Sequence, residues 1–432
     1  MSKRPISRRR FLRQVVGAAV GTASLPGIVP SSVFGMLAPS ERITLGFIGM
    51  GKQGTYLLRA FLNEPGTQVL AVCDVDTLKL KRARDLTDQF YSEQSATGSS
   101  KVCKSYRDFR QLLARDDIDA VVIATPDHWH SITVIEAVRA GKDIYCEKPL
   151  CQTISEAQTM VSEVRRHGRV FQTGSMQRSY SQFRYACELV RNGRIGKVQT
   201  VTVDVGGPPV DCDLPSEPVP DYLDWDRWLG PAPWRPYHSE LSPHISIDIF
   251  PNWRSYRDFG GGGMTDWGAH HFDIAQWGLG MDNSGPVEII APGLENNPVL
   301  TYKYAQGVTM TRDRFDEGYG VLFTGTEGKI EVNRSYIRTW PERIAREVIG
   351  PEEICLYRSS NHYADWLTAI RTRSKPICDV DIGRHSVIVC HLGNIAYQLG
   401  RKLRWDPVEE LFINDLEANR LLSRSMRSPW HL

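Results

Sequence analysis

The chain has 432 residues, of which 41% are hydrophobic and 24% charged, a composition that excludes collagen-like, disordered and multi-span membrane proteins. Six of its 52 basic residues lie within residues 1–13 and no acidic residue precedes Glu41, so residues 41–432 carry 46 basic and 50 acidic side chains. A body with this slight negative charge lacks the basic surface that nucleic acid or anionic lipid requires, and no nucleic-acid partner is expected.

The first forty residues have the features of an export signal. Arg8 and Arg9 stand in a basic segment, an uncharged stretch rich in Gly and Ala follows at 15–29, and small residues at 31–35 would suit a signal peptidase. The apolar stretch is too short to span a bilayer comfortably. This order resembles the twin-arginine export signal of bacteria. We therefore expect residues 1–35 to be recognised by the twin-arginine export machinery and the protein to be periplasmic; the alternatives are a chance basic terminus and an uncleaved anchor.

An apolar run at 43–48 predicts a buried parallel strand, and a helical pattern begins shortly after it. The turn between them has the Gly-x-Gly-x-x-Gly spacing of dinucleotide-binding proteins. The residues of this turn, all expected at the cofactor, are Gly49, Met50, Gly51, Lys52, Gln53 and Gly54. The first glycine would allow the tight turn, the second the approach of the pyrophosphate, and the third close packing of helix on strand. The amino end of the helix would attract the phosphates.

A second predicted strand, at 69–73, ends at Asp74, twenty residues after Gly54. An acidic residue at this spacing accepts hydrogen bonds from the ribose hydroxyls and repels a 2′-phosphate, so NAD is expected and NADP is less favoured. Lys79 and Lys81 follow downstream and leave NADP open. The alternative is that the glycines form a structural turn in another α/β fold.

Strands and helices continue to alternate as far as residue 173. Apolar runs predict further strands at 118–124, 143–146 and 170–173, with helical patterns between them. This alternation predicts a doubly wound parallel sheet, so residues 41–173 are expected to form an NAD-binding Rossmann domain. Ligands of such sheets bind beyond the carboxyl ends of the strands. The residues that fall at those ends are Gly49, Asp74, Thr125 and Lys148.

The second half of the chain begins with a predicted helix at 181–194 and a predicted strand at 198–205. Five prolines between residues 208 and 220 then indicate a long loop. The stretch after it is rich in tryptophan, whose rings either stack on sugars or pack in a core. These residues are Trp225, Trp228, Trp234 and Trp253. We consider Trp253 a candidate substrate contact.

Four consecutive glycines at 260–263 exclude regular structure and indicate a loop that another group approaches closely. From Thr265 the pattern becomes helical and places Asp266, His270 and Asp273 on one face. Acid–base catalysis is the preferred interpretation of this face, with a metal pair and a structurally capped helix as the alternatives. Because no further ligand stands at a recognisable spacing, no metal is expected.

Three motifs together resemble the Gfo/Idh/MocA oxidoreductases, the family of glucose–fructose oxidoreductase and inositol dehydrogenase. The motifs are Gly49-x-Gly51-x-x-Gly54, Glu147-Lys148-Pro149 and Gly261-Gly262-Gly263-x-x-Asp266-x-Gly268-x-His270-x-x-Asp273. The resemblance spans residues 41–425, and residues 376–396 resemble an exported branch of the family. It implies a C-terminal α+β domain over residues 174–432 with a large open, mostly antiparallel sheet, and association into a homo-oligomer through that sheet.

By this resemblance, Lys148, Asp266 and His270 match the catalytic residues of the family. His270 would accept the hydroxyl proton as hydride leaves the carbinol carbon, and Lys148 would stabilise negative charge on the oxygen. Asp266 would orient the pair or bind a neighbouring hydroxyl. His270 would thus also touch the substrate.

The resemblance also implies a nicotinamide side of the site. Its expected residues are Thr125, Pro126, His130 and Glu147. Arg178 is a further candidate substrate contact, with a plain ion pair as the alternative, and His271 is expected to be structural.

The expected function is an NAD-dependent oxidoreductase that acts on a hydroxyl of a sugar, a sugar derivative or a cyclitol. Free NAD is not expected outside the cytoplasm, so an exported enzyme of this kind would carry its cofactor tightly bound and regenerate it in place. One alternative is an NAD-dependent, redox-neutral glycoside hydrolase or lyase of the same fold. The other is a non-catalytic sugar-binding protein.

Overall fold

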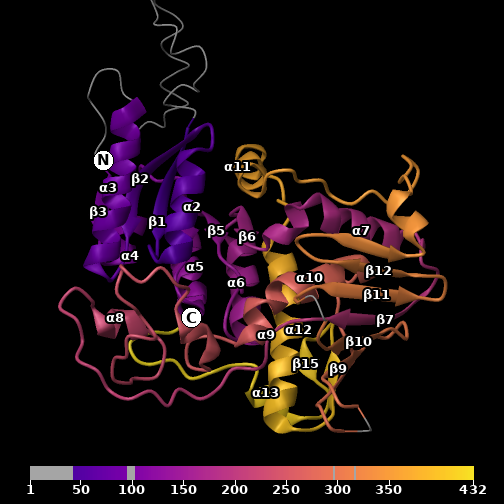
Figure 1. Ribbon diagram of the computed structural model, residues 1–432. Helices are drawn as coiled ribbons and strands as arrows, with labels where there is room; N and C mark the ends of the chain where they lie inside the picture. The colour runs from indigo at the N-terminus through magenta and orange to yellow at the C-terminus, as the bar shows by residue number, and fades with distance from the viewer. Residues whose placement is uncertain (1–41, 95–102, 295–296, 316–317) are drawn as a thin grey trace, which may run out of the picture. The chain divides into compact units, whose positions relative to one another are not determined.

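The computed structural model describes residues 42–94, 103–294, 297–315 and 318–432. The expected export signal at 1–35 lies outside the described residues. From Ile43 onward the chain forms one unit, which contains a six-stranded and a nine-stranded sheet (Figure 1). No helix within the described ranges is long and apolar enough to cross a membrane.

The six-stranded sheet is parallel throughout, in the order β3-β2-β1-β4-β5-β6. Its strands are β1 (Ile43–Ile48), β2 (Thr67–Cys73), β3 (Lys104–Tyr106), β4 (Ala120–Ile123), β5 (Asp143–Cys146) and β6 (Phe171–Thr173). The helices between them are α2 (Lys52–Leu62), α3 (Thr77–Gln94), α4 (Phe109–Leu113), α5 (His130–Arg139) and α6 (Ile154–Arg166). Since β1 and β4 are apolar and buried at nearly every position, both faces of the sheet are covered. The predicted doubly wound sheet is confirmed.

The strand order reverses between β1 and β4. From β1 the chain proceeds to β2 and β3 on one side, and then crosses back to β4 on the other. Doubly wound sheets bind their ligands at such a switch point, outside the carboxyl ends of the strands. A ligand site is therefore expected at the turns that follow β1, β2, β4 and β5.

The nine-stranded sheet has the order β13-β12-β11-β7-β10-β9-β8-β14-β15. Its strands are β7 (Val198–Val203), β8 (Glu288–Ile290), β9 (Thr301–Lys303), β10 (Thr309–Arg312), β11 (Val321–Gly325), β12 (Lys329–Val332), β13 (Ile337–Trp340), β14 (Leu403–Asp406) and β15 (Leu411–Phe412). Every neighbouring pair is antiparallel except β7 and β10. The large, mostly antiparallel sheet implied by the resemblance is confirmed.

One face of this sheet packs against three helices, α7 (Ser181–Arg191), α10 (Gly268–Leu279) and α12 (Val380–Leu399). The shared core joins Phe183 and Phe272 of the helices to Val201 and Phe323 of the strands. At Gly278 a Cβ atom would lie 2.5 Å from the Phe323 ring, so glycine is needed for α10 to lie this close to the sheet. Along the strands, polar residues alternate with the buried ones and form the opposite face.

Two elements of the second half are shorter than the sequence predicts. Helix α7 ends at Arg191 instead of residue 194, because Gly193 takes a positive φ of 72° and closes the helix. Strand β7 ends at Val203, short of the predicted 205. The helix α11 (His362–Thr372) adds Trp366 to a core beside the six-stranded sheet.

The long loop after β7 forms a small core of its own against the first sheet. It contains only the short helices α8 (Trp225–Leu229) and η5 (Asn252–Ser255) before α9 (Gly263–Asp266). Backbone bonds from Thr77 to the Tyr222 carbonyl (2.9 Å) and from Asp224 to the Val75 carbonyl (3.1 Å) attach it beyond β2. Trp225 and Trp228 stack on each other 4.6 Å apart and help to form this core, whereas Trp234 is exposed.

The C-terminal residues return to the first half after α13 (Leu416–Arg420). Arg427 pairs with Asp226 of α8 at 2.5 Å. The Trp430 ring meets the edge of Trp129 with centroids 4.7 Å apart. The tail thus fastens the long loop to the six-stranded sheet.

Arg178 lies in η4 (Met176–Ser179) and is only 2% exposed. Its guanidinium donates to Asp273 of α10 at 2.8 Å through two bonds and to Asp282 at 2.7 Å, and it lies over the Trp277 ring. It lines neither of the cavities described below. The prediction that Arg178 contacts substrate is therefore wrong, because its donors are already satisfied by the buried carboxylate of Asp273 and the partly buried one of Asp282.

Replacing Arg178 by alanine is expected to lower the free energy of unfolding by about 3–5 kcal/mol, since it leaves Asp273 as an uncompensated buried charge. Urea denaturation measures the change. The matched control is Arg343→Ala, whose side chain is 79% exposed and whose nearest carboxylate is 3.9 Å away; it should cost less than about 1 kcal/mol. Equal effects of the two substitutions would contradict the structural role of Arg178.

Candidate active site

Two adjoining cavities open where the strands of the six-stranded sheet end. The first, of about 160 Å³, lies between the turns after β1 and β2 and the long loop. The second, of about 840 Å³, lies between the turn after β5 and helices α9 and α10. Lys52, Thr125 and Trp253 belong to the lining of both. A ligand that spans both cavities would therefore pass the Gly-rich turn.

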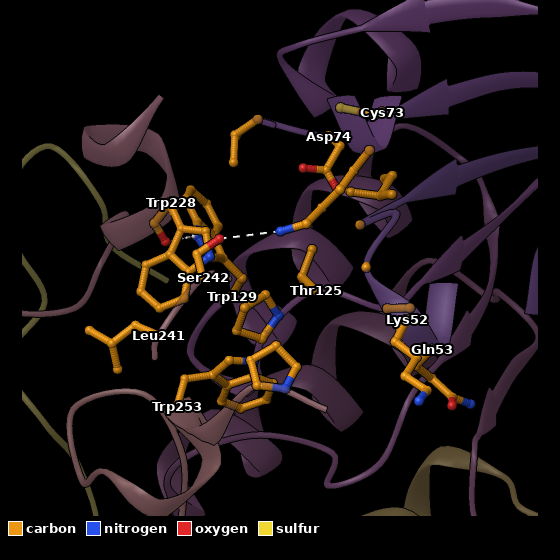
Figure 2. A pocket seen from close by; sticks show the side chains of 18 of the residues that line it. Lys52, Gln53, Cys73, Asp74, Thr125, Trp129, Trp228, Leu241, Ser242 and Trp253 are labelled. Atoms are coloured by element: carbon orange, nitrogen blue, oxygen red, sulfur yellow. Dashed lines mark hydrogen bonds between the residues drawn. The ribbon is translucent and has the colours of Figure 1, made fainter. Parts of the chain in front are cut away.

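Figure 2 shows side chains of the long loop facing those of the Rossmann turns in the first cavity. Trp228, Leu241 and Trp253 come from the loop, and Asp74 and Thr125 lie across from them. The loop therefore forms a wall of the cavity, and Trp253 is part of it; its contact with substrate stays a prediction.

The three glycines of the turn have different surroundings. A Cβ atom on Gly49, whose φ is +88°, would lie 2.7 Å from the backbone of Ala124, and one on Gly54 would lie 1.9 Å from the Gly49 carbonyl oxygen. A Cβ atom on Gly51 would meet no protein atom within 4 Å. Gly49 and Gly54 therefore serve packing, whereas Gly51 leaves space for a ligand to approach the backbone.

Helix α2 begins directly after Gly51, which supplies no side-chain cap. Its first N–H groups and the positive end of its dipole are thus available to an anion. Lys52 and Gln53 of its first turn line both cavities, whereas Met50 is fully buried and lines neither. The turn fits the pyrophosphate of a dinucleotide.

Asp74 stands at the end of β2 in the first cavity. Its carboxylate accepts hydrogen bonds from the Met50 N–H at 2.5 Å and the Asp76 N–H at 2.8 Å. Burial raises the pKa of Asp74, although the charge of Lys79 opposes this. Lys79 itself is tied to Asp76 at 3.2 Å and to Ser242 of the long loop at 3.2 Å. Asp74 is in place to accept bonds from ribose hydroxyls.

The second cavity brings Lys148 and Asp266 into contact across 118 residues of sequence. The Lys148 Nζ donates to Asp266 Oδ1 at 2.5 Å and to the Asp266 carbonyl oxygen at 3.0 Å. Burial raises the pKa of Asp266, but the charges of Lys148 and Arg254 outweigh burial and lower the pKa overall. The Asp266 carboxylate is therefore ionised and holds the lysine in the cavity.

His270 lies in the first turn of α10 and is 5% exposed. Its Nδ1 is buried and has no hydrogen-bond partner within the described part of the chain. Burial and then the charge of Lys148 lower the pKa of His270 well below its usual value. The imidazole is consequently neutral near pH 7 and able to accept a proton.

The predicted helix from Thr265 is two helices that meet at Trp267. Helix α9 ends at Asp266 and α10 starts at Gly268. The two segments place Asp266 and His270 in the same cavity, but Asp273 lies elsewhere, in the ion pair with Arg178. The prediction that all three share one functional face is thus wrong for Asp273.

Thr125, Pro126 and Glu147 of the predicted nicotinamide side line the cavities. The Glu147 carboxylate accepts a hydrogen bond from Gln53 Nε2 at 2.9 Å. His130 does not line either cavity: its ring nitrogens lie 3.0 Å from the Thr125 carbonyl oxygen and 2.9 Å from that of Pro149. His130 thus connects two site loops instead of touching a ligand, because it is buried beneath them. His271, bound to the Asp204 carbonyl at 2.9 Å, is structural as expected.

Four arginines that line the second cavity were not predicted from the sequence, and two of them, Arg254 and Arg334, lower the pKa of Asp266. Arg254 lies over the Trp253 ring at 4.2 Å, with its Nε 3.8 Å from Asp266 Oδ1, and Arg334 lies over the Trp267 ring at 4.7 Å. Arg254 directly follows Trp253, a candidate substrate contact, so its position in the sequence could have indicated it. Arg334 stands in a turn between β12 and β13, and no motif marks it.

A doubly wound sheet with a glycine turn, an acid after β2 and a lysine–carboxylate–histidine group is the arrangement of an enzyme with a dehydrogenase-type fold. Residues 43–175 match the family described as "Oxidoreductase family, NAD-binding Rossmann fold". Residues 210–432 match "Oxidoreductase family, C-terminal alpha/beta domain". The chain belongs to the Gfo/Idh/MocA oxidoreductase family.

Curated relatives share part of the chain. A "Glycosyl hydrolase family 109 protein 2" of Shewanella sp. (strain ANA-3) is 34% identical over 167 residues, which is 36% of this chain and 36% of the relative. A "Glycosyl hydrolase family 109 protein" of Saccharopolyspora erythraea is 32% identical over 211 residues, 45% of this chain and 44% of the relative. The chain thus matches less than half the length of these relatives.

Solved structures share the fold. The aldose-aldose oxidoreductase of Caulobacter crescentus has a TM-score of 0.56 at 20% identity, covering 84% of this chain and 99% of that one. The WlbA dehydrogenase of Bordetella pertussis, solved with NADH and UDP-GlcNAcA, has a TM-score of 0.56 at 17% identity, with 84% and 99% covered. At such identities the likeness concerns the fold.

The glycine geometry predicts opposite effects of two similar substitutions. Gly51→Ala should leave the fold unchanged and weaken dinucleotide binding, because its Cβ would enter only the ligand space. Gly54→Ala should lower the melting temperature, because its Cβ would collide with the Gly49 carbonyl. Thermal unfolding and the nucleotide content of the purified variants provide the two measurements. A Gly51→Ala variant that unfolds early while retaining full nucleotide content would contradict this assignment.

Proposed function

We propose that the protein transfers hydride between a tightly held NAD and a hydroxyl-bearing carbon of a sugar, a sugar derivative or a cyclitol. The observation that carries the proposal is the Lys148–Asp266 contact beside a neutral His270, in a cavity that adjoins the dinucleotide cavity. The residues that would hold NAD are those of the glycine turn, the first turn of α2 and Asp74.

Lys148, His270 and Asp266 each have a separate role in the oxidation of an alcohol. Bound NAD supplies the acceptor for the hydride as the carbon–hydrogen bond breaks. Lys148 donates a hydrogen bond to the reacting oxygen and stabilises its developing negative charge. The His270 imidazole accepts the proton that leaves the same oxygen as the carbon–oxygen double bond forms. Asp266 fixes the position of the Lys148 ammonium group.

NAD is preferred to NADP in this proposal. Asp74 offers its carboxylate oxygens to the ribose hydroxyls and would repel a 2′-phosphate. Lys79, the cation that lies nearest along the chain, is bound to Asp76 and Ser242 instead.

Retention of the cofactor follows from the covering of the first cavity. Lys52 binds Asp248 of the long loop at 3.2 Å, and Lys79 binds Ser242 of the same loop. These contacts support a nucleotide that stays bound between turnovers and is regenerated by a second substrate or by the second half of a redox-neutral reaction.

A redox-neutral glycoside hydrolase is the second candidate, favoured by the glycosyl hydrolase names of the curated relatives. Oxidation of a ring hydroxyl would acidify the adjacent C–H bond, and the hydride would later return. Release of an aglycone from a glycoside without net formation of NADH favours this candidate. Accumulation of a keto sugar favours the dehydrogenase.

Exchange of Lys148 for methionine should lower kcat by about 100- to 1000-fold without loss of bound NAD. In the wild type, kcat should decline only below pH 6.5, because the pKa of His270 is lowered and activity is lost on its protonation. In the variant this decline should move to higher pH, because a cation that lowers the His270 pKa is gone. Lys329→Met, exposed on β12, is the control. An unchanged kcat in Lys148→Met would refute the assignment.

The remaining features of the proposed function are export of the protein and its assembly into an oligomer. We propose that residues 1–35 direct the folded protein with its NAD through the twin-arginine machinery to the periplasm, where it forms a homo-oligomer. Wild-type protein should occur in the periplasmic fraction and release NAD on denaturation, whereas a variant with lysines at Arg8 and Arg9 should remain in the cytoplasm. Light scattering measures the assembly. Periplasmic protein without nucleotide would contradict the retained cofactor.

A further inference from the structure

The second cavity carries more positive charge than oxidation of a neutral sugar requires. Lys148, Arg254 and Arg334 line it and lower the pKa of Asp266, and Lys52 of the same lining pairs with Asp248. Burial raises the pKa of the two other inward carboxyls, Asp127 and Glu147, and so opposes their ionisation. The cavity is therefore suited to an additional negative charge.

Arg334 is an exposed residue that lines the second cavity, in a turn between β12 and β13 whose backbone is held by hydrogen bonds. The Asn333 side-chain oxygen accepts hydrogen bonds from the N–H groups of Ser335 at 2.8 Å and Tyr336 at 3.0 Å. The Arg334 carbonyl oxygen accepts one from Gln182 of α7 at 3.0 Å. These three hydrogen bonds hold the backbone of the turn. The turn, which belongs to the second sheet, therefore places Arg334 at the cavity.

The Arg334 guanidinium lies over the ring of Trp267, the residue that joins α9 to α10. Trp267 in turn stacks on Tyr319, with centroids 4.4 Å apart. The charge of Arg334 contributes to lowering the pKa of both Asp266 and His270. Arg334 thus stands beside the reacting groups, with its plane oriented by an aromatic ring.

No carboxylate within the described ranges pairs with Arg334. By contrast, Lys148 and Arg254 approach Asp266 at 2.5 and 3.8 Å, and Lys52 approaches Asp248 at 3.2 Å. A guanidinium has five N–H donors in a planar fork that matches the two oxygens of an anionic group. Its donors are therefore available to a ligand in the cavity.

We propose that the substrate is an acidic sugar, and that Arg334 binds its anionic group while Lys148 and His270 act on a hydroxyl of the same molecule. The anionic group is a carboxylate or a sulfate or phosphate ester, which share the oxygen geometry that arginine recognises. Arg334 is then a specificity-determining residue. This inference rests on the proposed function and deepens it by naming the charge of the substrate.

The test compares matched acidic and neutral sugars on the full-length protein with its bound nucleotide. The pairs are glucuronate with glucose and galacturonate with galactose, and glucose 6-sulfate and glucose 6-phosphate distinguish the source of the charge. Single-turnover reduction of the bound nicotinamide gives the rate constant of hydride transfer, which stands for kcat, and the half-saturating sugar concentration, which stands for KM. The shift in melting temperature reports binding without turnover. Variants are Arg334→Gln, Arg334→Lys and the control Arg346→Gln, an exposed arginine outside both cavities.

The wild type should prefer the acidic member of a pair. Arg334→Gln should raise KM for that member about 10- to 100-fold with kcat nearly unchanged, and should leave the neutral member unaffected. Arg334→Lys should restore part of the preference, and Arg346→Gln should behave as wild type.

Equal KM values for acidic and neutral sugars in the wild type would overturn the inference, as would an Arg334→Gln variant that affects both members alike. If none of the sugars reduces the nicotinamide, the proposed function fails. In that case, a melting shift that acidic sugars alone produce and that Arg334→Gln abolishes still supports the anion site, and its absence refutes it.

Discussion

The structure depends on one contact, between the ammonium group of Lys148 and the carboxylate of Asp266. Lys148 follows strand β5 of the dinucleotide sheet, and Asp266 ends α9 beside the second sheet. The contact is half-buried, with the side chains 18% and 28% exposed, so it retains more strength than a surface ion pair. It positions the lysine, whose charge adds to the effect of burial in lowering the pKa of His270 and so favours the neutral imidazole.

The long loop and the tail build the remaining walls around this contact. The loop between β7 and α9 supplies Trp253 and Arg254 to the cavities and binds Lys52 and Lys79 of the Rossmann half. The tail fixes the loop through Arg427. Such a cover is consistent with the retained nucleotide that we propose.

Local patterns in the sequence predicted the local parts of the fold. The apolar run, the glycine turn and Asp74 form one short strand–turn–helix unit, so their spacing alone defines the Rossmann half. The second sheet came from the resemblance, since its strands of two to six residues carry little periodicity of their own. Lys148 and Asp266 were recognised by motif, but nothing in their spacing shows that they touch.

The incorrect predictions concern residues whose surroundings come from parts of the chain that are distant in the sequence. Arg178 has the chemistry of an anion contact, but its partners Asp273 and Asp282 are 95 and 104 residues away. Helical periodicity could not show that the chain breaks at Trp267. His130 stands next to cavity residues in sequence, although it is buried behind them. Arg334 was missed because only the packing of a strand turn on Trp267 brings it to the site.

The most direct test of the account follows the hydrogen itself. The purified protein is incubated with a sugar deuterated at its carbinol carbons and then denatured, and the released nicotinamide is analysed by mass spectrometry. The account predicts deuterium in the released nicotinamide from wild type, and far less from Lys148→Met and His270→Gln proteins that carry the same amount of NAD. A wild-type protein whose bound nicotinamide is reduced by the sugar but carries no deuterium would contradict it.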